Sequence, residues 1–352
     1  MFVRNTWYVA AWADEVARGS ILPRVLLDEA VILYRTQSGT PGALEDRCCH
    51  RAAPLSLGTV NGELVECGYH GLRFDQSGRC VHIPLQREIP PKARVKSYPI
   101  VERWRFLWIW MGDPALADPG LIPEHYCMDR PEWDVSRGDL FHVKGNYQLV
   151  SDNFLDASHV VYVHKSTLAQ PEVVDFPIRM ERTDRSVSMT RWMIDVPPSP
   201  FHSSLRQFPG NVDRWQIAHV TAPSHFSLDL GSAPTGTGAP EGRRVNAVTI
   251  LSPNEITPET ESACHVFYAH CRNFALDDMA MREKVRQDML TAYREDWTMI
   301  EAQQRKIDAD PEHPLLTLGQ DSGVVALRRI IQQMIAQEEA GDAVPRDQRI
   351  RA

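Results

Sequence analysis

Two short segments of the chain each combine a cysteine with a histidine. Cys48 and His50 are separated by one residue, and Cys67 and His70 are separated by two residues. The two pairs are 16 residues apart, with residues 51 to 66 between them. Two thiolates and two imidazoles at this spacing can close a tetrahedral site around one metal ion, or hold both irons of a two-iron cluster. The spacing therefore predicts a metal centre built from two loops.

The mixture of ligand types within each loop favours an iron–sulfur cluster over zinc. Structural zinc sites usually pair Cys with Cys in one loop and His with His in another. A Rieske [2Fe–2S] centre needs two Cys on one iron and two His on the other. Gly68 lies within the second pair and Gly71 directly follows it, and both would let backbone N–H groups approach the cluster sulfurs. We therefore predict a [2Fe–2S] Rieske cluster, with a structural zinc site as the alternative, on Cys48, His50, Cys67 and His70.

A second group of potential metal ligands lies between residues 146 and 164, where we expect a helix over 146–160. On that helix Asp152 and Asp156 would share a face, and His159 would lie beside them. His164 would lie about 140° round an undistorted helix from His159, so both imidazoles can reach one ion only if the helix breaks. The β-branched residues Val160, Val161 and Val163 are the expected place for that break.

The carboxylate that would complete this second site is expected on a long helix over residues 278–308. The helix has an apolar stripe of Val, Met, Tyr and Ile side chains, and position 296 within the stripe is Asp. A carboxylate on a buried face is costly unless it is paired or bound to a metal. We therefore expect Asp296, and not Asp288 or Glu295, to join the two histidines, and we expect Glu295 to project to the outer face. Two His and one carboxylate form the facial triad of non-haem Fe(II) oxygenases.

Composition and charge restrict the class of protein that carries these sites. The chain has 352 residues, of which 43% are hydrophobic and 24% charged, as in ordinary globular proteins. Its formal net charge of −8 argues against general binding of nucleic acid or of an anionic membrane. Seven cysteines, no apparent signal peptide and no apolar run long enough to cross a bilayer point to a reduced protein, which we expect in the cytoplasm.

The pattern of short strands and long helices predicts two domains and an α+β fold. Residues 1–115 combine short apolar runs with turn residues, which is typical of a small all-β domain around the cluster. One of its strands carries Trp104, Phe106, Trp108 and Trp110 in alternation, as a half-buried strand would. Residues 116–352 contain several strands followed by helices over 278–308 and 323–338, which predicts an antiparallel sheet with long C-terminal helices.

The residues of both sites resemble those of a known enzyme family. Segments 48–56 and 67–72 are similar to the two cluster loops of Rieske non-haem iron aromatic oxygenases. The spacing of Asp152, Asp156, His159 and His164 is similar to the iron-binding motif of their large (alpha) subunits. The first loop departs from the family at Cys49, where Pro is usual, but the ligand spacing is intact. The similarity runs nearly end to end and is greatest to vanillate O-demethylase oxygenase components, dicamba monooxygenase and toluenesulfonate methyl-monooxygenase.

This resemblance implies a helix-grip fold for the catalytic domain and assigns a role to each ligand. His159, His164 and Asp296 would bind a mononuclear Fe(II), and Asn153 would be an amide near that iron. Asp156 would connect this iron to the cluster of a neighbouring subunit through His70, which requires a head-to-tail homotrimer. Because the chain lacks a Gly-x-Gly-x-x-Gly motif after a strand, electrons would come from a separate NAD(P)H-dependent reductase with flavin and an iron–sulfur centre.

The implied activity is that of a terminal monooxygenase acting with O₂. The expected reaction is O-demethylation of a methoxylated, vanillate-like aromatic acid to a phenol and formaldehyde. Hydroxylation of a methyl group or the ring of an aromatic sulfonate or carboxylate is the alternative, and a Rieske electron carrier without oxygenase chemistry is a second one. Four polar side chains in sheet-forming segments are candidates for binding the acid, namely His225, Arg206, Arg214 and Thr249.

Overall fold

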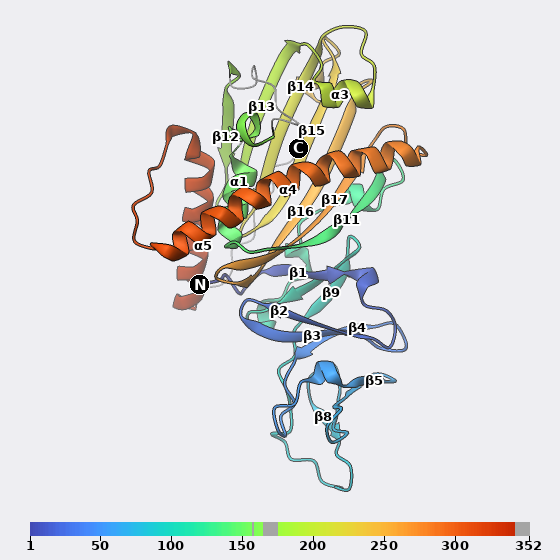
Figure 1. The fold of residues 1–352 in the computed structure, drawn as a ribbon. Coiled ribbons are helices and arrows are strands. Elements are labelled where there is room, and N and C mark those ends of the chain that lie inside the picture. Colours follow the sequence, from blue (N-terminus) through green and yellow to red (C-terminus); the bar gives the residue numbers. More distant parts are fainter. Residues whose placement is uncertain (157, 165–174, 342–352) are drawn as a thin grey trace. The chain divides into compact units, whose positions relative to one another are not determined.

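A computed structural model describes residues 1–156, 158–164 and 175–341 of the chain. The chain forms two compact units, whose elements carry their labels in Figure 1. The first contains Met1–Ile122, with Thr257–Glu261 and the end of the last helix from Gln337. The second contains Pro123–Ile256 and Ser262–Ala336. The domain boundary expected after residue 115 stays a prediction, because a division by contacts does not show where an independently folding domain ends.

The first unit consists of small antiparallel sheets, as the short apolar runs predicted. Two sheets have three strands each, in the orders β1-β10-β9 and β2-β3-β4, and a third has four strands in the order β5-β6-β7-β8. The strands are β1 (Trp7–Trp12), β2 (Ile21–Leu26), β3 (Glu29–Arg35), β4 (Pro41–Glu45), β5 (Thr59–Asn61), β6 (Leu64–Glu66), β7 (Arg73–Phe74), β8 (Cys80–His82), β9 (Ile100–Arg103) and β10 (Phe106–Trp110).

Strand β10 differs from the half-buried strand that the aromatic alternation predicted. All of its residues from Phe106 to Trp110 are buried, so both faces of the strand are covered. Trp7 of the neighbouring β1 packs edge-on against Trp110, with ring centroids 5.5 Å apart. Trp104 lies in the turn before the strand, where its φ is +55°, and not in the strand itself. The alternation failed here because Leu107 and Ile109, between the aromatic residues, are equally apolar.

The second unit is built on one antiparallel sheet of seven strands, in the order β11-β17-β16-β15-β14-β13-β12. Cross-strand pairing places Met189, Ala218 and Leu228 in one row across β13, β14 and β15, with Arg191, Gln216 and Leu230 in the next row. The strands are β11 (Asp134–Val143), β12 (Ile178–Arg182), β13 (Ser186–Val196), β14 (Val212–Thr221), β15 (His225–Pro234), β16 (Val248–Thr260) and β17 (Ala263–Arg272).

Helices of the second unit pack on this sheet and on one another. They are α1 (Tyr147–Leu155), α2 (Val160–Val163), α3 (Pro200–Leu205), α4 (Met279–Ala309) and α5 (Ser322–Ala340). Figure 1 shows α4 crossing the sheet, and its Trp297 packs edge-on against Phe141 of β11 at 5.5 Å between ring centroids. An N-cap at Asp278 accepts a hydrogen bond from the N–H of Met281 and starts α4. The architecture confirms the expected α+β class, and no described helix is long and apolar enough to span a membrane.

The expected single helix over 146–160 is wrong in its extent. Helix α1 ends at Leu155, and Asp156 has an extended backbone with φ −82° and ψ 97°. The break therefore precedes the three valines, which instead form the separate turn α2. Their β-branched side chains tolerate one helical turn, while the local side-chain hydrogen bonds of Asp156 compete with continuation of α1. His159 and His164 are the N-cap and C-cap of this turn, and the backbone leaves the helical conformation at His164, where φ is −96° and ψ is 40°. The undistorted helix that would keep the two imidazoles apart is therefore absent, as expected, although the break at Asp156 lies before both of them.

Candidate metal centres and cavity

The two cysteine loops of the first unit share one backbone hydrogen-bond pattern. In the first loop the N–H of Ala52 donates to the carbonyl of Cys48 (2.9 Å), and in the second the N–H of Gly71 donates to the carbonyl of Cys67 (3.0 Å). Ala52 and Gly71 both have positive φ, +55° and +68°. Each cysteine N–H is also bonded across its loop, to the carbonyl five residues later. The two loops thus share a backbone hydrogen-bond pattern around their cysteines, while the histidine lies two residues after Cys48 and three residues after Cys67.

The second loop passes so close to the first segment that a side chain at Gly68 has no room. A Cβ built there would lie 2.4 Å from the carbonyl oxygen of Leu57. Glycine is therefore needed for loop-to-loop contact, which is a different reason from the approach to sulfur expected from the sequence. On the other side, both carboxylate oxygens of Asp46 accept hydrogen bonds from Ser56, at 2.7 Å from its N–H and 2.7 Å from its hydroxyl.

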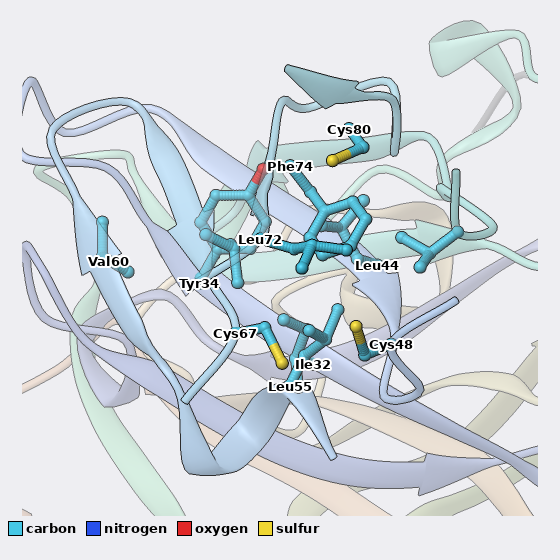
Figure 2. Close-up of a cluster of buried hydrophobic side chains, with 12 residues drawn as sticks. Ile32, Tyr34, Leu44, Cys48, Leu55, Val60, Cys67, Leu72, Phe74 and Cys80 are labelled. Atoms are coloured by element: carbon cyan, nitrogen blue, oxygen red, sulfur yellow. The ribbon is translucent and has the colours of Figure 1, made fainter. Parts of the chain in front are cut away.

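The thiols and the imidazoles of these loops lie on different sides. Cys48 and Cys67 are buried in the apolar core of the unit, and Figure 2 shows their sulfur atoms turned toward each other, with Cys80 at the far side of the cluster. Burial, together with the neighbouring Cys67 thiol, raises the pKa of Cys48 to about 12. His50 and His70 are exposed, with ring centroids 4.7 Å apart. A two-iron cluster fits this donor set, because its sulfur-bound iron would be buried and its nitrogen-bound iron exposed.

The second unit brings three widely separated residues to one point. The ligand atoms of His159, His164 and Asp296 all lie within 4.8 Å of one another. The Nε2 atoms of His159 and His164 lie 3.5 and 3.3 Å from Asp296 Oδ1. Asp296 is only 4% exposed, and Asn153 on α1 donates a hydrogen bond of 3.0 Å to the same Oδ1. Two neutral imidazoles and one carboxylate on one side of an ion, with the other positions open, fit a non-haem iron.

Glu295 does not project to the outer face, contrary to the expectation from the helix stripe. Its Oε2 accepts a hydrogen bond of 2.8 Å from Nδ1 of His164. Because an ionised carboxylate can only accept, this bond assigns the proton of the imidazole to Nδ1 and leaves the lone pair of Nε2 for a metal. Although burial lowers the pKa of His164, Asp296 and Glu295 raise it by more, so its net shift is upward.

Asp156 lies between the end of α1 and His159. Its Oδ1 accepts hydrogen bonds from the N–H (2.7 Å) and the hydroxyl (2.6 Å) of Ser158, and its Oδ2 is 3.7 Å from Nδ1 of His159. Burial alone would raise the pKa of Asp156, but the nearby His159 ring and the hydrogen bonds from Ser158 outweigh burial and lower the pKa. Asp152 instead pairs with Arg328 of α5, whose Nε is 3.2 Å from Oδ1, so the two aspartates have separate partners.

A cavity of about 730 Å³, partly open to solvent, adjoins the triad. His159, His164 and Asp296 are among the residues that line it, and the lining as a whole is mostly apolar. That wall comes from side chains at alternate positions of β13 to β15 and from α4, and includes Met189, Ala218, Leu228, Leu230, Met289 and Ala292. The strand residues of this wall were not predicted from the sequence, although alternation with period 2 places Leu228 and Leu230 on one face of β15.

None of the four candidates for binding an acid lines this cavity. His225 is buried and its Nδ1 lies 2.5 Å from Oε2 of Glu255, which also contacts His125. Thr249 is buried, and its N–H donates to the side chain of Asn273. Arg214 is buried on β14, next to the cavity wall rather than in it, while Arg206 is exposed at the end of α3. Their proposed contact with substrate stays a prediction.

Comparison with protein families gives two matches that together cover most of the chain. Residues 6–99 match the Rieske [2Fe-2S] domain. Residues 143–337 match the vanillate O-demethylase oxygenase C-terminal domain. Both metal centres described above lie inside these ranges, one in each.

Individual relatives are similar over nearly the whole chain. The iron-sulfur subunit of the toluene-4-sulfonate monooxygenase system of Comamonas testosteroni is 44% identical, over 97% of this chain and 100% of the relative. The oxygenase component of dicamba O-demethylase of Stenotrophomonas maltophilia is 38% identical, over 96% and 99%. The vanillate O-demethylase oxygenase subunit of a Pseudomonas species is 38% identical, over 97% and 98%.

Solved structures show the same fold from end to end. The crystal structure of dicamba monooxygenase bound to 3,6-dichlorosalicylic acid superposes with a TM-score of 0.89 at 35% sequence identity, over 96% of this chain and 99% of that one. A further structure of that enzyme, with non-heme iron and dicamba, superposes with a TM-score of 0.84 at 34% identity, over 97% and 99%.

Proposed function

Because the chain belongs to the Rieske oxygenases, as an oxygenase component of the type found in vanillate O-demethylase, we propose that it removes a methyl group from a methoxylated aromatic acid. The observation that carries this proposal is the convergence of His159, His164 and Asp296 in the lining of a mostly apolar cavity. A Rieske electron carrier would need neither the triad nor the cavity, so these features favour oxygenase chemistry over that alternative.

Two sets of side chains are proposed to hold the cofactors. His159, His164 and Asp296 would bind the mononuclear iron, with the Asn153 amide fixing the orientation of the Asp296 carboxylate. When bound, the cluster and the iron would supply one-electron transfer and activation of O₂. The set that would hold the cluster is Cys48, His50, Cys67 and His70.

The reaction proposed for this site consumes two electrons and one O₂ for each methyl group. An aryl methyl ether, O₂, NADH and a proton would give a phenol, formaldehyde, NAD⁺ and water. One oxygen atom enters a C–H bond of the methoxy group, and the resulting hemiacetal breaks its bond between the oxidised carbon and the ether oxygen. The chain's part in this is to exclude water with the apolar wall and to hold the methoxy group toward the triad.

Electrons are proposed to reach the triad through a neighbouring subunit. We expect His70 of one subunit to donate a hydrogen bond to Asp156 of the next, and three subunits to close a head-to-tail ring. The exposed ring of His70 and the hydrogen-bonded, low-pKa carboxylate of Asp156 support this pairing. The electrons themselves would come from an NAD(P)H-dependent reductase with flavin and an iron–sulfur centre, and we expect the whole system in the cytoplasm.

The experiment that tests this function is product analysis with the complete system. Purified protein with both metal centres is combined with a compatible reductase, NADH and O₂, and is offered vanillate and other methoxybenzoates. We expect one formaldehyde and one matching phenol for each NADH consumed. Oxidation of NADH without formaldehyde for any methoxylated acid would reject O-demethylation while leaving the oxygenase class in place.

Hydroxylation of an aromatic sulfonate is the second candidate function. It is favoured by the 44% identity to the toluene-4-sulfonate monooxygenase subunit, against 38% for the vanillate and dicamba relatives. The same product analysis with 4-methylbenzenesulfonate would then yield the corresponding benzyl alcohol and no formaldehyde.

A further inference from the structure

The polar groups that line the cavity come from two sets of elements, the helices with their flanking residues and the sheet. One group consists of the triad with Asn153 and Asp156, which lie on or beside α1, α2 and α4. Tyr293 also lines the wall, but its hydroxyl donates to Asn254 at 2.6 Å and is thereby occupied. Among the described lining residues this leaves Gln216 of β14 as the polar side chain set in the apolar sheet wall. A polar group in such a wall usually fixes the orientation of a ligand.

The neighbour of Gln216 on β13 determines which end of its amide faces the cavity. Arg191 is the direct cross-strand partner of Gln216, and its Nη1 lies 3.5 Å from Gln216 Oε1. A guanidinium has only donors, so the amide oxygen must face it. The two N–H groups of Gln216 Nε2 then point away from Arg191, and the described residues offer them no hydrogen-bond acceptor. The cavity wall therefore presents a donor.

Two buried cations lie behind this donor. Arg191 and Arg214 are each only 4% exposed, and Arg214 shares the face of Gln216 because it lies two residues before it on β14. Burial, with the charge of Arg191 added to it, lowers the pKa of Arg214 to about 10, so Arg214 stays charged at neutral pH. Positive charge behind an N–H donor strengthens its bond to a negatively charged oxygen.

We propose that the Gln216 amide, polarised by Arg191, is the anchor for an anionic oxygen of the substrate, either a carboxylate or a sulfonate. The anion would bind at the sheet wall while the group to be oxidised faces His159, His164 and Asp296. Gln216 is then a specificity-determining residue, and it differs from the four side chains that the sequence put forward for this role. This inference rests on the proposed function in one respect, namely that the substrate binds in this cavity.

The test compares the binding of anions with that of their neutral isosteres, without turnover. Dissociation constants are measured by calorimetry on the holoenzyme under anaerobic conditions. The probe pairs are 4-methoxybenzoate with 4-methoxybenzamide, and 4-methylbenzenesulfonate with 4-methylbenzenesulfonamide. A larger preference for the anion in the benzoate pair indicates a carboxylate site, and a larger preference in the benzenesulfonate pair indicates a sulfonate site. These binding constants do not depend on whether the proposed reaction takes place. Failure of the proposed function can therefore be distinguished from failure of the proposed anion site.

Two substitutions separate recognition from folding. Gln216→Glu keeps an acceptor for Arg191, and so should preserve the local structure, but it removes the donor and adds a negative charge. Gln216→Leu removes donor and acceptor together. Gln303→Leu, on the exposed face of α4, is the matched control.

We expect wild-type protein to bind the better anion about 10- to 100-fold more tightly than its neutral isostere, as for a hydrogen bond to a charged group. Gln216→Leu should lose most of this preference. Gln216→Glu should invert it, because a carboxylate repels the anion and accepts from the N–H of the amide probe. The control should behave as wild type. Equal binding of anion and isostere by wild-type protein, no binding of either anion, or an unchanged preference in Gln216→Glu would overturn the proposal.

Discussion

The hydrogen bond between Glu295 and His164 predicts that a residue which binds no metal controls the iron affinity of the site. Glu295 Oε2 accepts from His164 Nδ1 at 2.8 Å, while His164 Nε2 faces Asp296 at 3.3 Å. The carboxylate thus fixes the ring orientation and keeps the proton on the nitrogen that does not face the metal. Its side chain is 23% exposed, so solvent weakens the interaction only partly. Glu295→Gln replaces this charged acceptor by a neutral one of the same shape.

The size of the effect follows from the type of bond that is lost. A hydrogen bond to a charged group contributes about 1.5–3 kcal/mol and one between neutral groups about 0.5–1.5 kcal/mol. The difference of about 1–1.5 kcal/mol corresponds to about a 10-fold weaker affinity for iron. Glu295→Ala removes the acceptor altogether, and for this variant we expect a loss of about 100-fold, the upper end for such supporting residues.

The assay is competition for Fe(II) between the protein and a chelator of known affinity. The visible absorbance of the [2Fe–2S] cluster serves as an internal measure that the other unit is intact. Glu283→Gln is the control, because Glu283 lies on the same helix, fully exposed, and bonds only to neighbours on that helix. Iron affinity in both Glu295 variants equal to that of wild type, or an equal loss in the control, would contradict this role of Glu295.

Three further perturbations test other parts of the molecule. Asp156→Asn should keep both the cluster and the iron, as measured by metal analysis, but its turnover should fall at least about 100-fold. Full turnover with both metals present would contradict the proposed link between subunits. Glu255→Gln should cost about 3–5 kcal/mol of unfolding free energy, since it removes the buried carboxylate that is hydrogen-bonded to the ring nitrogens of two histidines. Burial tends to raise the pKa of Glu255, but the two histidines outweigh burial and lower the pKa below the usual 4.5. The stabilisation that the Glu255 carboxylate provides is therefore complete above pH 4.5 and is lost as the pH falls below this value. Below pH 4.5 the melting temperature of Glu255→Gln should depend less on pH than that of the wild-type protein. Gly68→Ala would place a Cβ 2.4 Å from the Leu57 carbonyl, and we expect loss of cluster absorbance, while an unchanged spectrum and melting temperature would show that the loops can separate.

The candidate metal ligands could be identified from the amino-acid sequence alone. Two short loops that each combine a cysteine with a histidine are compatible with few kinds of metal site. Their spacing was therefore sufficient to predict that Cys48 and Cys67 belong to the same metal site. Asp296 was also accessible from the sequence, because a carboxylate within an apolar helix stripe is costly without a partner. These inferences need only local geometry or a single periodicity.

The contacts that neighbouring residues make with these ligands depend on the tertiary structure. Glu295 and Asp296 are about 100° apart around α4, so periodicity sends one inward and the other outward. Both reach His164 because an imidazole carries nitrogens on two edges and can contact successive helix positions at once. Helical periodicity assigns each residue to one side of the helix. It cannot predict that one histidine contacts two successive helix residues assigned to different sides.

The cavity wall depended on the tertiary structure for a related reason. Alternation on β14 places Gln216 and Ala218 on one face, but it does not show which face of the sheet is hollow. Trp215 on the opposite face is also buried, packed with Ala233 and Ala247, so burial does not distinguish the two faces either. The cavity lies on the face that α1 and α4 cover, because their side chains complete its wall. The position of these helices relative to the sheet is set by long-range packing.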